Sequence, residues 1–150
     1  MPVLLTETIM ATVTTVLDSA LAATVYRGRV DPIEDSKLPA VGIFQGAEQP
    51  AGEQGRMNLA FMDQFLEVRT EVAARSTSEN IETDLNEQRR LVHQLLMAAD
   101  ALSLAYVIDI IPNGVDEPNI DGSSDKYTGT MVLNWIVYYR HQQADAGLAP

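Results

Sequence analysis

The sequence predicts an α+β fold, in which two helices pack on one face of a mainly antiparallel sheet of about five strands. Apolar residues recur at helical spacing in residues 6–21 and 79–102, and they alternate with polar residues in residues 60–74 and 127–141. A strand with one apolar and one charged side is typical of an antiparallel sheet that is covered on a single face. The expected order of elements along the chain is α-β-β-β-α-β-β.

Length and composition define the broad class. The chain has 150 residues, 46% of them apolar, which predicts one domain over residues 1–150 with a substantial core. It has no cysteine, which excludes disulfides, thiolate nucleophiles and zinc–thiolate sites. The net charge of −11 opposes tight binding to nucleic acid. No window resembles a membrane span or a secretory signal, so we expect a soluble, intracellular protein.

The first part of the chain predicts a helix followed by two short strands. Thr6 is the expected N-cap, and one apolar face follows it at the spacing i, i+4, i+7. That face consists of Ile9, Val13, Val16, Leu17, Ala20 and Leu21. Residues 25–30 form a strand that ends at a turn through Asp31 and Pro32, and residues 40–45 form the next strand.

Residues 46–58 have no apolar periodicity, and their Gly, Pro and Gln content predicts a flexible connection or a long hairpin tip. In the long strand that follows, apolar and charged side chains alternate. The apolar side has Met62, Leu66, Val68, Val72 and Ala74, and the charged side has Asp63, Glu67, Arg69, Glu71 and Arg75.

The second helix has a possible capping box from Ser76 to Glu79, and its apolar stripe continues to Leu102. A strand over residues 105–111 is expected to end at Pro112-Asn113-Gly114, and an acidic loop is expected over residues 115–125. In the last strand Met131, Leu133, Trp135, Val137 and Tyr139 share one face, and a flexible tail begins at about residue 142.

The residues that could do chemistry favour a structural interpretation, and we expect neither an enzyme nor a bound cofactor or metal. His93 lies beside an apolar stripe, which predicts a partly buried structural side chain, and His141 is expected near solvent at a strand end. Residues 117–122 are similar to the start of a calcium loop, but the twelfth position is Thr128 and not a bidentate Glu. A solvated acidic loop is therefore expected, with weak or intersubunit divalent-ion binding as the minor alternative. No phosphate-binding glycine motif occurs.

Arg27 and Arg29 alternate in one strand, so both point to the same side. Two interpretations remain open. They could belong to a solvated edge strand, where charge discourages uncontrolled pairing. They could instead pair with carboxylates of a neighbouring subunit, for which Glu67, Glu71 and the loop at residues 31–35 are available.

The order of elements and four local patterns resemble the tail terminator proteins of long-tailed bacteriophages. These patterns are Val25-Tyr26-Arg27-Gly28-Arg29-Val30 after the first helix, Leu38-Pro39-Ala40-Val41 at the next strand, the charged strand of residues 65–75, and Trp135-Ile136-Val137-Tyr138-Tyr139-Arg140. The resemblance covers residues 5–141. It implies a structural virion protein with no catalytic residues.

The resemblance further implies a ring of six subunits that caps the tail tube, ends tube polymerisation and joins the tail to the head connector. The expected partners are further copies of the chain, the tube protein and the connector protein, with DNA only passing through the lumen and no membrane contact. The expected location is the head-proximal end of the tail, after assembly in the host cytoplasm. Expected contact residues are Arg27, Arg29, Asp31, Arg56, Glu67, Arg69 and Glu71. Alternatives are a head-completion or neck protein of the same particle, and a small ligand-binding α+β domain.

Overall fold

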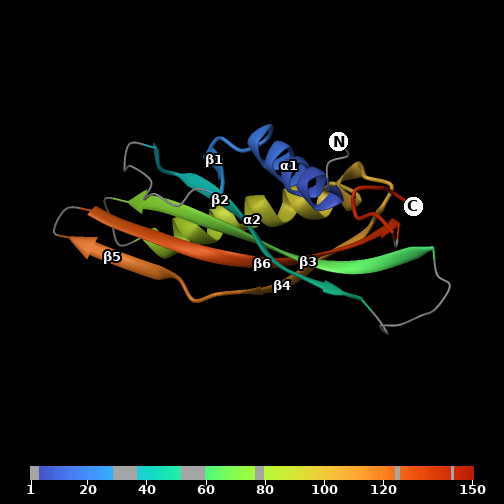
Figure 1. Cartoon of the computed structure of the whole chain (residues 1–150). Helices are drawn as coiled ribbons and strands as arrows, with labels where there is room; N and C mark the ends of the chain where they lie inside the picture. Colours follow the sequence, from blue (N-terminus) through green and yellow to red (C-terminus); the bar gives the residue numbers. More distant parts are fainter. Residues whose placement is uncertain (1–3, 29–36, 52–59, 77–79, 124–125, 143) are drawn as a thin grey trace.

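The computed structural model of the chain describes residues 4–28, 37–51, 60–76, 80–123, 126–142 and 144–150. Within these ranges, two α-helices lie on one face of a six-stranded sheet (Figure 1). The helices are α1 (Leu5–Asp18) and α2 (Ile81–Ala98), and the strands are β1 (Thr24–Arg27), β2 (Ala40–Pro50), β3 (Phe61–Ser76), β4 (Val107–Val115), β5 (Asn119–Ser123) and β6 (Lys126–Gln142). The α+β class and the predicted order are confirmed, with β5 as an additional strand.

The centre of the sheet is the antiparallel pair β3 and β6. The strands run in the order β1-β2-β3-β6-β4, and β5 also pairs with β6. β3 pairs with β6 along all 16 of its residues, from Phe61 opposite Gln142 to Ser76 opposite Tyr127. β1 is parallel to β2, and the other pairs are antiparallel. β4 and β5 pair with successive parts of β6, so together they form one edge of the sheet.

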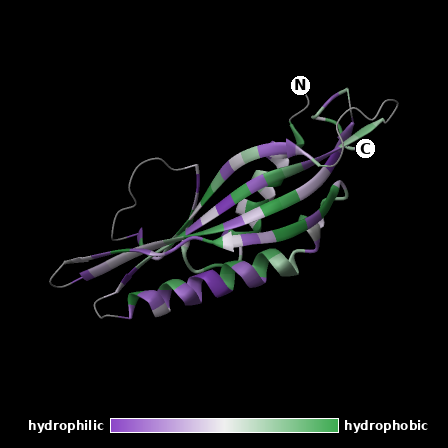
Figure 2. Ribbon diagram, turned by 90° about the horizontal axis from the view of Figure 1, so that it is seen from below, coloured by the Kyte–Doolittle hydropathy of each residue, from purple (hydrophilic) through white to green (hydrophobic). Residues whose placement is uncertain are grey.

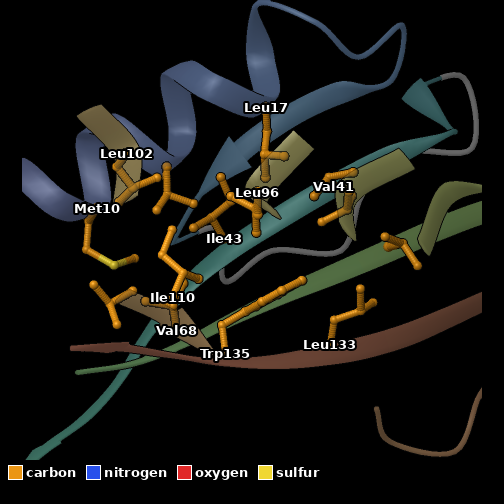
Figure 3. Close-up of a cluster of buried hydrophobic side chains, with 14 of the residues drawn as sticks. Met10, Leu17, Val41, Ile43, Val68, Leu96, Leu102, Ile110, Leu133 and Trp135 are labelled. Carbon is orange, nitrogen blue, oxygen red and sulfur yellow. The ribbon is translucent and has the colours of Figure 1, made fainter. Parts of the chain in front are cut away.

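The hydrophobic core lies between the helices and the sheet. The burial of β6 alternates residue by residue, and its buried side includes all five residues that the sequence predicts to share a face. On β3 the predicted apolar side is likewise buried at Leu66, Val68, Val72 and Ala74. Figure 3 shows side chains from α1, α2 and the strands in one layer, and Figure 2 shows hydrophilic and hydrophobic residues alternating along the strands.

Thr70 is a polar residue in the middle of the buried side of β3. Its hydroxyl oxygen accepts a hydrogen bond of 3.0 Å from the indole Nε1–H of Trp135, which is itself buried. A buried donor without a partner is costly, so this bond allows the largest core side chain to be buried without an unsatisfied N–H.

A β-bulge gives the far half of β2 a second attachment to the fold. Gly46 and Ala47 both lie opposite Glu67, because the register shifts between Gln45 and Glu48. Glu48 therefore shares the helix-covered face, where its carboxylate accepts hydrogen bonds from the hydroxyls of Thr6 and Tyr139. The two hydroxyls are themselves 3.1 Å apart. This cluster ties α1, β2 and β6 together.

The predicted helix caps are wrong. α1 begins at Leu5, so Thr6 lies inside the helix, buried and bonded to the cluster just described. Ser76 is the last residue of β3, and Asn80 precedes the first helical residue of α2 without a side-chain capping bond. Glu79 lies outside the described residues. Within the described residues, neither N-cap residue, Leu4 of α1 or Asn80 of α2, makes a side-chain capping bond.

Several predicted strand ends are also wrong. β2 continues through Gly46 to Pro50, so only residues 52–58 of the predicted connection lie outside the described residues. β4 continues through Pro112 and accommodates Asn113 and Gly114 opposite Asn134 as a bulge, which an edge strand tolerates.

Two segments expected to be irregular also belong to the fold. Residues 119–123 of the predicted acidic loop form β5. The predicted tail is attached to the domain, because the Leu5 N–H donates to the Ala146 carbonyl and the Gln142 N–H donates to the Leu148 carbonyl.

We predict that Thr70→Val lowers the free energy of unfolding by about 1–3 kcal/mol, because it leaves the Trp135 N–H buried without an acceptor. Urea unfolding followed by tryptophan fluorescence measures this change. The matched control is Thr130→Val on the other side of β6, where we expect a change within about 0.5 kcal/mol. Equal effects of the two changes would show that the Thr70 bond contributes nothing specific.

A second prediction concerns alkaline pH. Burial raises the pKa of the Tyr139 hydroxyl, and the hydrogen bond to Glu48 raises it further, while Thr6 opposes the shift. Because the pKa of Tyr139 in the folded protein lies above the unfolded value of about 10, the protonated hydroxyl contributes its full stabilisation below pH 10. This contribution is lost as the pH rises further. The stability difference between wild type and Tyr139→Phe should therefore be constant from pH 7 to pH 9 and narrow above pH 10. A constant difference throughout would contradict this assignment.

Candidate functional site: the uncovered face of the sheet

The sheet has one face without a helix over it in the described part of the chain, which we call the open face. It carries the side chains of β3 and β6 that alternate with the buried ones, together with their neighbours on β2 and β4. These side chains are Phe44, Phe61, Asp63, Phe65, Glu67, Arg69, Glu71, Arg75, Ile111, Thr128, Thr130, Val132, Asn134, Ile136, Tyr138 and Arg140.

All three phenylalanines of the chain lie on the open face and none lies in the core. Phe61 and Phe65 are 41% and 37% exposed, and the Phe65 ring centroid lies 5.1 Å from that of Tyr138. Beside them, Ile111 lies opposite Ile136. Aromatic side chains are enriched at protein interfaces, and exposed apolar patches in soluble proteins mark contact sites. The open face is therefore the candidate site of this molecule.

Polar contacts hold the apolar part of this face in place. The Arg140 guanidinium donates to both oxygens of Asp63, at 2.6 and 3.1 Å, and the Tyr138 hydroxyl donates to the same carboxylate at 2.8 Å. Farther along β6, the Asn134 amide donates to Asp116 at 3.0 Å. These bonds hold the Tyr138 ring beside Phe65.

Glu67, Arg69 and Glu71, which the sequence marks as contact residues, lie next to the aromatic group on the open face. They are opposite Ile136, Asn134 and Val132 of β6. None of the three forms an ion pair with another described residue, unlike Asp63 on the same strand. The site therefore combines an aromatic region held by hydrogen bonds with a row of alternating charges that have no ion-pair partner in the described part of the chain.

Arg27 lies elsewhere. It is opposite Ile43, on the helix side of β1, and its guanidinium donates two hydrogen bonds to Glu7 of α1, at 2.5 and 2.8 Å. This pair lowers the pKa of the Glu7 carboxyl through the hydrogen bond with Arg27. Neither interpretation from the sequence included a partner within the same subunit. Arg29, Asp31 and Arg56 lie outside the described residues.

The two histidines also differ from expectation. His93 is exposed and not partly buried, although its ring lies 5.5 Å from the Trp135 ring. His141 is buried and not solvated. Its Nδ1 lies 2.6 Å from the Gln142 carbonyl, while its Nε2 contacts the Gln64 amide at 3.3 Å. Both ring nitrogens of His141 thus have structural partners.

No group of three or more potential metal ligands occurs among the described residues, and residues 119–123 are extended in β5. Within the same ranges, neither helix combines the length and apolarity of a membrane span.

Two surface hollows occur among the described residues. One is lined by α1 alone, through Glu7, Thr8, Ala11, Thr12 and Thr15. The other lies between α2 and the β4–β5 connection and is bordered by charged Glu82, Arg89, Asp116 and Glu117. A single helix surface cannot enclose a ligand, and charged rims do not resemble the mainly apolar pockets of small-molecule sites. Within the described residues, the open face remains the stronger candidate.

Comparison with known proteins gives a fold-level match. No known protein family and no curated protein sequence matches the chain. Among solved structures, the fold is similar to that of a chain from the virion of a native gene transfer agent (GTA) particle. The TM-score is 0.53 at 17% sequence identity, and the match covers 86% of this chain and 93% of that chain. At this identity, the match establishes a shared fold.

The Arg27–Glu7 pair generates a prediction about the two interpretations of Arg27. Arg27→Glu places two carboxylates together and should lower the melting temperature at pH 7, and adding Glu7→Arg should restore it. Because the pKa of Glu7 is lowered, the contribution of the pair is present above the unfolded carboxyl pKa of about 4.5, and it is lost as the pH falls. Thermal unfolding at pH 7 and pH 3 measures both effects. Failure of the swap to restore the melting temperature would favour a partner outside the subunit.

Proposed function

We propose that the protein is a structural component of a phage-like virion, with a contact role and no catalytic one. The observation that carries the proposal is the open face, where all three phenylalanines lie beside a row of charges that have no ion-pair partner among the described residues. The shared fold with a chain of a gene transfer agent virion supports it. The histidines support a role without catalysis, because one packs on Trp135 and the other is bonded within the sheet.

Within this class, we propose the role of a tail terminator, to which the sequence patterns are similar. Six copies would form a ring at the head-proximal end of the tail tube, end its polymerisation and present a surface to the head connector. A ring requires two different patches on each subunit, one meeting the other on the next copy. The open face would supply one of these two patches.

The charge of the chain is compatible with that role. A net charge of −11 per subunit repels the phosphate backbone, so DNA would pass through the ring without adhering to it. Assembly would take place in the host cytoplasm, before the head joins the finished tail.

The alternatives lead to different observations. A head-completion or neck protein of the same particle would use the same face but would be found on heads without tails. A small ligand-binding domain needs an apolar pocket, and the hollows described above give it no support.

The test is removal of the gene from the particle that encodes it. We expect tail tubes of uncontrolled length and heads without attached tails, and we expect a tagged copy to label the head-proximal tail end in complemented particles. Electron microscopy of negatively stained lysates measures tube length and label position. Tails of normal length, joined to heads in the absence of the protein, would refute the terminator role. Label on tailless heads would favour the neck alternative.

A further inference from the structure

The charges of the open face alternate in sign along one strand. Glu67, Arg69 and Glu71 lie at every second position of β3, on one side of it, without an ion-pair partner in the described part of the chain. Like Phe65 beside them, Glu67 and Arg69 are exposed. A surface that covers this region must therefore offer apolar area next to charges that alternate in the opposite order.

A second copy of the chain meets the charge requirement at Arg69 and Glu71, while Glu67 faces Ala73. A two-fold axis that runs parallel to the sheet below Thr70, midway between the two copies and perpendicular to β3, turns one open face toward the other and reverses the strand direction. Residues at equal distances on either side of Thr70 then face each other. Arg69 of one copy faces Glu71 of the other, and the same contact occurs a second time, because such an interface is self-complementary.

The same operation covers the apolar side chains. β3 lies over β3 and β6 over β6 of the second copy, at the separation of about 10 Å that is usual for two packed sheets. Twist turns such sheets by roughly 30° relative to each other, which displaces residues least near the axis. The Arg69–Glu71 contacts lie next to the axis. Farther out in the same register, Phe65 faces Arg75 and Tyr138 faces Thr128 of the second copy, so both aromatic rings are covered.

We propose that the free protein pairs with a second copy through the open face, with reciprocal Arg69–Glu71 contacts at the centre. The pair covers the aromatic side chains until another virion protein replaces the second copy, so it delays contacts with the wrong partner. This inference does not rest on the tail terminator role, since it concerns the isolated chain.

The test is charge reversal followed by a double swap, with the dimer dissociation constant measured by sedimentation equilibrium. Arg69→Glu and Glu71→Arg each place like charges together at two symmetric contacts, so each should raise the dissociation constant by about tenfold or more. The double variant restores both contacts with reversed polarity, and its dissociation constant should return to within about threefold of wild type. Rescue of this kind requires that both residues meet in a contact between two copies.

The matched control is Arg89→Glu, which makes the same charge change at an exposed arginine of α2 and should leave the dissociation constant unchanged. Circular dichroism and thermal unfolding confirm that each variant is folded. A wild-type protein that stays monomeric up to about millimolar concentration, single variants that dimerise normally, or a double variant without rescue would each overturn the proposal. None of these results would affect the tube-length experiment, which tests the terminator role separately.

Discussion

The pairing of β3 with β6 is the constraint on which the other features depend. With 16 consecutive residues in one antiparallel register, the side chains of both strands are divided strictly between two faces. The two helices cover one face, where Trp135 and Thr70 are bonded. The residues that alternate with the buried ones along both strands must then lie on the other face. The open face, with its aromatic group and its charge row, is thus a direct consequence of the register that builds the core.

Much of the fold could be predicted from sequence, because period-2 and period-3.6 patterns report burial directly. Glycine and proline were less reliable guides. Gly46 was interpreted as the end of a strand, but it opens a bulge, and Pro112 is tolerated because β4 is an edge strand. The Thr6 hydroxyl could not be assigned from local sequence, since its partner Glu48 becomes a neighbour only through that bulge.

The candidate site was predicted only in part. The charged side of β3 was recognised, and Glu67, Arg69 and Glu71 do share a face. The aromatic half was missed, although Phe65 lies on the same side of β3 as Glu67. Ile136 and Tyr138 likewise lie on the same side of β6 as Asn134. The partner of Arg27 was beyond local sequence, because Glu7 approaches it only when α1 packs beside β1. Tertiary packing, and not strand pattern, decides which charges are already satisfied.

The central claim is that the open face, and not the helical side, is the contact surface of this molecule. Hydroxyl-radical footprinting tests it most directly, by comparing dilute monomer with protein in assembled particles. We expect labelling of Phe61, Phe65 and Tyr138 to fall strongly in particles, while labelling of Met97, which is exposed on α2, changes little. Unchanged labelling of the three aromatic residues together with protection of Met97 would contradict the account.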